Sequence, residues 1–161
     1  MAIRLLDNEI ATLIKEQKLL DKELSLPLDL RVTKLGHLEC NIPAKGVSAN
    51  EFMIIVRKSQ ENPLDFSVIL AYQLPESTRL FRLRRYNGNS HEHTNTIERC
   101  SFTTFHIHTA TARYQELGRK EDAYAEPTDR YGELDGAVFC MLEDCGFDTS
   151  TQKQLRLFEV M

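Results

Sequence analysis

The spacing of apolar residues predicts one amphipathic helix near the N-terminal end of the chain. Between residues 3 and 23, apolar side chains recur at the spacing of one helix face, and charged residues fill most other positions. The apolar positions are Ile3, Leu6, Ile10, Leu13, Ile14 and Leu20. Pro27 cannot continue a helix, so a connector is expected around it.

Five strands are predicted after this helix. They cover residues 30–42, 52–56, 66–72, 80–86 and 102–109. Apolar and polar side chains mostly alternate in the first strand, which is typical of a half-exposed strand. The second and third strands are nearly continuous apolar runs, as in central strands covered on both faces. Short polar links favour antiparallel pairing, so the sequence predicts a five-stranded meander.

The pattern becomes helical again after residue 109. Residues 110–117 predict a short helix that Gly118 ends, and a second helix is expected from Leu134 to Cys145, before Gly146. The polar segment between these helices is expected to be a loop, either a lid or a helix entrance. The chain is therefore predicted to be one α+β domain, with an N-terminal helix (3–23), a sheet (30–109) and a C-terminal helical part (110–161). No structure is predicted for the tail at 148–161.

The composition is that of an ordinary globular protein, with 42% hydrophobic and 27% charged residues. No apolar run reaches the length of a membrane span, and the N-terminus lacks the features of a signal peptide, so we expect a cytoplasmic protein that does not bind membranes. The cysteines (Cys40, Cys100, Cys140 and Cys145) are scattered and are expected to be reduced and partly buried.

The net charge of −4 hides an uneven distribution. Residues 79–120 hold eight of the 20 Lys and Arg residues but three of the 24 Asp and Glu residues. This band predicts either one cationic face on an acidic body or charges that scatter over several sides. The chain has no phosphate-cradling glycine loop, G-x-S-x-G elbow or dinucleotide fingerprint, which argues against nucleotide-dependent and serine-hydrolase chemistry.

The fourth and fifth predicted strands carry the candidate chemistry. If both strands turn their apolar residues toward the core, alternation places Arg82, Arg84, His106 and His108 together on the opposite face. The alternative interpretation is a strand pair with one solvated polar face, where Arg and His are common.

Arginine and histidine are the residues that a metal-independent ribonuclease needs. One histidine removes the proton of the 2′-hydroxyl, another protonates the leaving oxygen, and guanidinium groups stabilise the phosphorane charge. The loop between the two strands carries His91 and His93 and is expected to fold over the same surface. The candidate catalytic groups are His106, His108, His91 and His93, the candidate phosphate-binding groups are Arg82, Arg84, Arg85 and Arg113, and the supporting groups are Tyr86, Asn87 and Tyr114.

A metal-dependent hydrolase is a further interpretation of the same histidines. His91-x-His93 and His106-x-His108 each place two imidazoles on one side of an extended segment, with Glu92 nearby in sequence. Neighbouring arginines would repel a dication, and no Asp or Cys shows ligand spacing. The ribonuclease hypothesis therefore includes neither a metal nor any other cofactor.

Two motifs carry a resemblance to a known family. The run from Leu80 through Arg-Arg-Tyr86-Asn87 to His91-Glu-His93, followed by Phe105-His106-Ile-His108, resembles the TumE-type toxins of bacterial toxin–antitoxin modules. It is also similar to uncharacterised phage and prophage proteins with the run RRYNG…HEHTN…FHIHTA. The match covers about a quarter of the chain. The chain departs from the pattern at Gly88, where a polar residue is expected, in the histidine spacing, and in its acidic C-terminal third.

The resemblance implies a small α+β toxin that acts on RNA and is held by an antitoxin. The expected partners are therefore RNA and a protein, and a homodimer is compatible with the sequence. The alternative function is a non-enzymatic phage or mobile-element protein that binds and inhibits a host protein.

Overall fold

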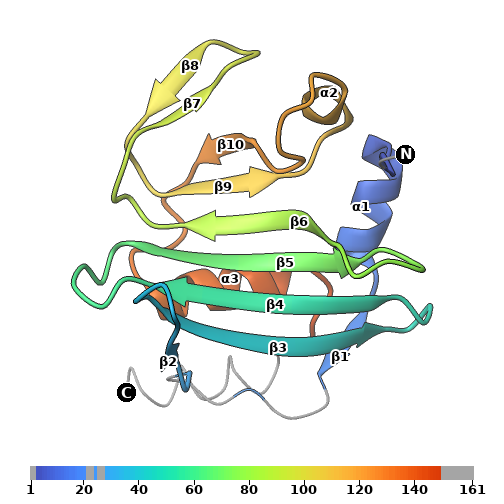
Figure 1. The fold of residues 1–161 in the computed structure, drawn as a ribbon, viewed down its shortest axis with the longest axis horizontal. Coiled ribbons are helices and arrows are strands. Elements are labelled where there is room, and N and C mark those ends of the chain that lie inside the picture. Colours follow the sequence, from blue (N-terminus) through green and yellow to red (C-terminus); the bar gives the residue numbers. More distant parts are fainter. Residues whose placement is uncertain (1–2, 21–23, 25–27, 150–161) are drawn as a thin grey trace.

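The computed structural model describes residues 3–20, 24 and 28–149, in which a large antiparallel sheet is accompanied by three helices (Figure 1). The sheet has eight strands in the order β1-β3-β4-β5-β6-β9-β10, with β2 paired to β3, while β7 and β8 form a separate hairpin. The helices are α1 (Asp7–Lys15), α2 (Ala112–Glu116) and α3 (Leu134–Asp144). The strands are β1 (Lys18–Leu20), β2 (Arg31–Val32), β3 (Leu38–Gly46), β4 (Glu51–Lys58), β5 (Phe66–Gln73), β6 (Leu80–Asn87), β7 (His93–Asn95), β8 (Cys100–Phe102), β9 (His106–Thr109) and β10 (Tyr124–Pro127).

The α+β class and the antiparallel sheet are confirmed, but the predicted count of five strands is not matched. The additional strands β1 and β10 are short and lie at the two edges of the sheet, and the first predicted strand is divided into β2 and β3. The fifth predicted strand is divided, because β8 belongs to the hairpin and β9 to the sheet. The sheet consequently continues into the part expected to be helical. Residues 150–161 of the predicted tail lie outside the described residues.

The first helix is shorter than the expected range 3–23. It ends at Lys15, and Lys18 begins strand β1. The side chain of Lys18 is buried, and its Nζ donates to the carbonyl oxygens of Leu13 and Ile14 at 2.8 and 2.9 Å. The last carbonyls of a helix have no partners within it and favour a nearby cation. The lysine therefore closes the helix instead of extending it.

The sheet has two faces of different character. The core face, which carries Val68 and Tyr86, packs against α1 and α3, and Figure 1 shows α3 behind β4 and β5. The arginine face, which carries Arg57, Arg82 and Arg85, points the other way. Its apolar part is a small cluster of Ile55, Ile69 and Ala71 with Met53 and Leu80. Within the described residues, no helix has the length and apolar character needed to cross a membrane.

A bulge in β6 separates two arginines that the sequence places together. Leu70 and Ala71 are adjacent in β5, yet they pair with Arg84 and Arg82, so Leu83 is an extra residue in β6. Leu83 is fully buried in the core. The bulge shifts the alternation by one position, which sends Arg82 to the arginine face and Arg84 to the core face. The expectation that both meet the histidines is therefore wrong for Arg84.

Candidate metal centre

Strand pairing brings two histidines onto the arginine face. In the ladder between β6 and β9, Asn87 lies opposite His106 and Arg85 lies opposite His108. Because alternate residues share a face, both imidazoles lie beside Arg85. The two histidines are 1% and 3% exposed, so neither is a solvated surface residue. Histidines and an arginine therefore lie close together, but the arginine beside the two histidines is Arg85 and not the expected Arg84.

The β7–β8 hairpin supplies a third histidine. Asn95 fixes the hairpin to β10, because its amide donates to the carbonyl oxygen of Ala125 at 2.7 Å and its Oδ1 accepts from the Ala125 N–H at 2.9 Å. The ring of His93 then stacks on that of His106, with centroids 5.3 Å apart, and meets the ring of His108 at 4.7 Å. The hairpin thus brings His93 beside the two buried histidines.

Hydrogen bonds to carbonyl oxygens define the protonated nitrogen of each buried ring. The Nδ1 atoms of His106 and His108 lie 2.8 and 2.7 Å from the carbonyl oxygens of Thr104 and Asp122. A carbonyl oxygen only accepts, so each Nδ1 carries the hydrogen and each Nε2 keeps a free lone pair. A ligating histidine in a metal site characteristically donates its other N–H in this way.

Both buried imidazoles favour the neutral form. Burial, together with the charge of Arg85, lowers the pKa of His108 to about 2. Burial also lowers the pKa of His106, and the neighbouring His93 adds to this effect. A neutral imidazole binds metal ions, whereas a general acid has to carry a proton near working pH. The two side chains are therefore better suited to ligation than to proton donation.

One ring nitrogen from each of His93, His106 and His108 lies within 4.8 Å of the others. In the described part of the chain, this is the one group of three or more His, Cys, Asp or Glu side chains close enough to share an ion. Zinc binds imidazole nitrogen at about 2.0–2.1 Å, so an ion would draw the nitrogens closer by about 1 Å. Three imidazoles suit zinc and other first-row transition metals.

Acidic residues offset the arginines near this centre. The fully buried carboxylate of Asp122 lies 3.2 Å from Nε of Arg85 and 3.7 Å from Nε of Arg82. Glu121 lies 3.3 Å from Arg82. The arginines alone would repel a dication. The carboxylates of Asp122 and Glu121, which are distant from these arginines along the chain, reduce this repulsion.

Three predicted site residues lie elsewhere. On the core face, Arg84 lies 3.5 Å from the carboxylate of Asp144, and the hydroxyl of Tyr86 donates to the same carboxylate at 2.7 Å. Arg113 pairs with Glu98 at 2.7 Å. Five of the eight charges of the basic band are thus paired with acids on different sides of the fold, so these five do not form one cationic face: Arg79, Arg82, Arg84, Arg85 and Arg113.

The remaining predicted residues, Tyr114, His91 and Asn87, are not members of the three-histidine group. The hydroxyl of Tyr114 donates to Glu98 at 2.6 Å and accepts from the N–H of Ile97, so it holds the loop between β7 and β8. His91 is exposed and its Nδ1 lies 2.9 Å from the hydroxyl of Ser90. Asn87 is buried and its amide faces both imidazoles of β9.

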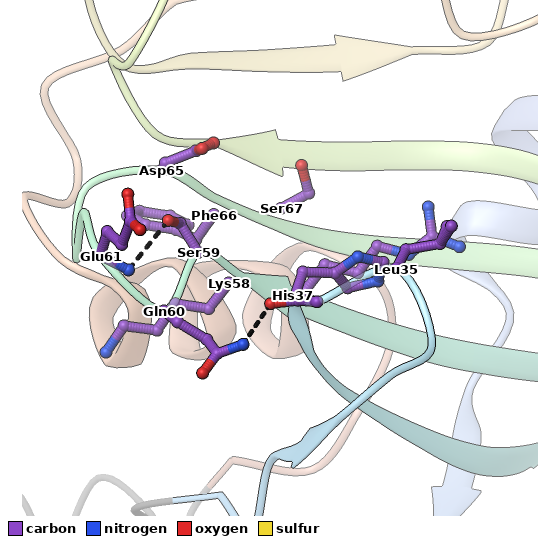
Figure 2. Close-up of a pocket in the computed structure, with 11 residues that line it drawn as sticks. Leu35, His37, Lys58, Ser59, Gln60, Glu61, Asp65, Phe66 and Ser67 are labelled. Atoms are coloured by element: carbon purple, nitrogen blue, oxygen red, sulfur yellow. Dashed lines mark hydrogen bonds between the residues drawn. The ribbon is translucent and has the colours of Figure 1, made fainter.

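A cleft of about 690 Å³ lies on the arginine face (Figure 2). Arg57, Ser67, Asn87 and His106 form one row across β4, β5, β6 and β9, and the first two line the cleft. The Ser67 hydroxyl donates to Oδ1 of Asn87 at 2.8 Å, and Figure 2 shows it pointing toward β6. The row therefore connects the cleft to the histidines through two contacts, one from Ser67 to Asn87 and one from Asn87 to His106.

The site includes residues that sequence reasoning does not find. In the sequence, Asp122 lies in a polar loop, Asn95 lies beside a histidine pair and Ser67 lies in an apolar run. Only the pairing of distant strands shows their roles. The position of Asn95, two residues after His93 in an extended segment, is the one local signal. Comparisons with protein-family models, curated proteins and solved structures found no match.

Proposed function

We propose that the protein is a metal-dependent hydrolase whose centre is a first-row transition-metal dication bound by His93, His106 and His108. The observation that carries this proposal is the convergence of three imidazoles, two of which donate Nδ1–H to main-chain carbonyl oxygens and leave Nε2 unprotonated. Three neutral ligands leave the full charge of the dication in place. A dication with three protein ligands and an open position lowers the pKa of a bound water to about 7, which supplies a hydroxide nucleophile.

The proposed substrate is a phosphodiester of RNA. Arg82 and Arg85 lie on the same sheet face as the centre, and each guanidinium has five N–H donors, more than its acidic partner uses. Guanidinium groups stabilise the charge that a phosphoryl group gains in the transition state. A mechanism that uses His106 or His108 as the general acid has less support, because burial lowers the pKa of both side chains.

Metal content and RNA cleavage test this proposal together. Protein purified without a histidine tag should contain about one transition-metal ion per chain by elemental analysis. It should degrade RNA, and EDTA should stop the reaction. His93→Gln, His106→Gln and His108→Gln should lose metal and activity, while His91→Gln should keep both, because His91 lies outside the cluster. A metal-free protein that cleaves RNA in EDTA would overturn the metal proposal.

The toxin role and its antitoxin partner remain proposals that depend on this activity. If the protein is a toxin that cleaves RNA, its expression should stop bacterial growth, and expression of His106→Gln should not. Equal growth arrest by both proteins would favour the alternative of a non-enzymatic inhibitor of a host protein.

A further inference from the structure

Asn87 occupies a special position beside the three histidines. Its Nδ2 lies 3.5 Å from Nε2 of His106 and 3.4 Å from Nε2 of His108, so one amide group faces both free lone pairs. Its Oδ1 accepts from the Ser67 hydroxyl at 2.8 Å. The residue is 7% exposed, and both ends of its amide are therefore committed within the protein. In this arrangement the N–H donors of the amide interact with the Nε2 lone pairs of the two imidazoles, as a bound cation would.

A dication cannot coexist with this orientation of the amide. The NH₂ group has no lone pair to offer, and its hydrogens carry partial positive charge. The carbonyl oxygen of the same side chain is a metal ligand. A half-turn about the Cβ–Cγ bond exchanges the oxygen and the nitrogen within nearly the same volume, since the two ends of an amide are almost identical in shape.

Ser67 allows this half-turn without the loss of a hydrogen bond. A hydroxyl has one donor and two acceptor lone pairs. The Ser67 hydroxyl donates to Oδ1 of Asn87 in the present orientation and would accept from Nδ2 after the rotation. A residue that only donates or only accepts would oppose one of the two states.

No carboxylate in the described residues competes for the fourth position. The metal-ligand group found there contains the three histidines and no Asp or Glu. The buried carboxylate of Asp122 lies against Arg85 at 3.2 Å and Arg82 at 3.7 Å. The open position is therefore bordered by an amide rather than by a carboxylate.

We propose that Asn87 is the fourth protein ligand of the metal through Oδ1, delivered by rotation of its amide, with Ser67 reversing the direction of their hydrogen bond. The water that the proposed hydrolysis needs would then be a fifth ligand. This inference rests on the proposed metal centre. Because Ser67 lines the cleft, the reversal also frees its O–H to point into the cleft. Metal binding then adds a hydrogen-bond donor to the cleft wall beside Arg57, which suits a phosphate oxygen of the substrate.

Titration of the metal-free full-length chain with zinc and cobalt(II) chloride tests the role of Asn87. Asn87→Ala should bind zinc about ten to a hundred times more weakly than the wild type, and Asn87→Asp at least as tightly, because a carboxylate oxygen replaces the amide oxygen. The visible spectrum of bound cobalt(II) should change in both variants, since it reports directly on the ligand set. Ser67→Ala should weaken binding less than Asn87→Ala. Asn89→Ala, in the exposed loop after β6, is the matched control.

The outcomes separate this inference from the proposed function. If the wild type binds metal and both Asn87 variants match it in affinity and cobalt spectrum, the metal centre stands and Asn87 is not a ligand. If Asn87→Asp binds as weakly as Asn87→Ala, the ligand role is also overturned. If the wild type binds no metal, the proposed centre itself fails.

Discussion

At the residue scale, the partner of one ring nitrogen decides what each histidine can do. His106 and His108 face main-chain carbonyl oxygens, which only accept, so the tautomer of each ring is set. His91 also carries its hydrogen on Nδ1, because the Ser90 hydroxyl at 2.9 Å donates to Asp65 and can only accept from the ring, but this side chain is exposed and lies outside the cluster. Residue type alone does not distinguish these histidines, although their chemistry differs.

Gly88 shows the same dependence on surroundings and leads to a prediction. A Cβ added at this position would lie 1.8 Å from the carbonyl oxygen of Leu64, a main-chain atom that cannot move aside easily. This close approach explains why a glycine stands at this position. Gly88→Ala should lower the free energy of unfolding by about 1–3 kcal/mol in urea denaturation. Gly132→Ala, with no heavy atom within 4 Å, should change it by less than about 0.5 kcal/mol. Equal effects would contradict the role of Leu64.

At the element scale, side chains that join elements position the site. Asn95 holds the β7–β8 hairpin against β10, and Glu98 in the hairpin loop binds Arg113 and Tyr114 of α2. On the core face, Asp144 of α3 accepts from Tyr86 of β6. Such contacts fix the position and orientation of β6 and of the hairpin, and therefore of the site side chains that they carry.

The Asp144 contact predicts how stability depends on pH. Partial burial opposes ionisation, but hydrogen bonds from Arg130 and Tyr86 outweigh it and hold the pKa of Asp144 below 3.8. In the folded state this carboxylate binds its proton less readily than in the unfolded state. Its stabilisation is therefore present above pH 3.8 and is lost as the pH falls through the folded pKa.

Asp144→Asn should test this linkage. At pH 7 the variant should be less stable by about 1.5–3 kcal/mol, because a charge-assisted hydrogen-bond acceptor is lost. Urea unfolding at a series of pH values should show this difference shrinking below pH 3.8. Asp129→Asn, an exposed acid nearby in sequence, is the control. A difference that stays constant down to pH 2 would contradict the assignment.

At the scale of the whole molecule, a bound metal would tie the hairpin and the sheet to each other. His106 and His108 belong to the eight-stranded sheet, while His93 belongs to the separate β7–β8 hairpin. An ion bound by all three would join the hairpin to the sheet. Because the three ligands meet only in the folded state, binding must also stabilise the fold.

Zinc should therefore raise the melting temperature of the metal-free protein. At a free zinc concentration 100 times Kd, the expected stabilisation is about 2.7 kcal/mol, or about 5–10 °C for a chain of this size. EDTA should reverse the shift in a calorimetric scan. His91→Gln should respond as the wild type does, and His93→Gln should not respond. An equal rise in His93→Gln would show that zinc binds elsewhere.

The sequence by itself determined the features that depend on local periodicity. Alternating and continuous apolar runs indicate an antiparallel sheet, because side-chain direction repeats every two residues along a strand. The same rule places His106 and His108 on one face, and both share it in the structure. Local spacing is sufficient for such pairs.

Only the tertiary structure decided which residues from different strands meet. The bulge at Leu83 follows from the packing of β6 against β5 and the core, and it exchanges Arg84 for Arg85 beside the histidines. His93 reaches the other two histidines, and Asp122 offsets the charges of Arg82 and Arg85, through contacts between residues about 13 to 40 positions apart. Neither hydrophobic periodicity nor spacing contains this information, because it arises from how the strands and the hairpin pack.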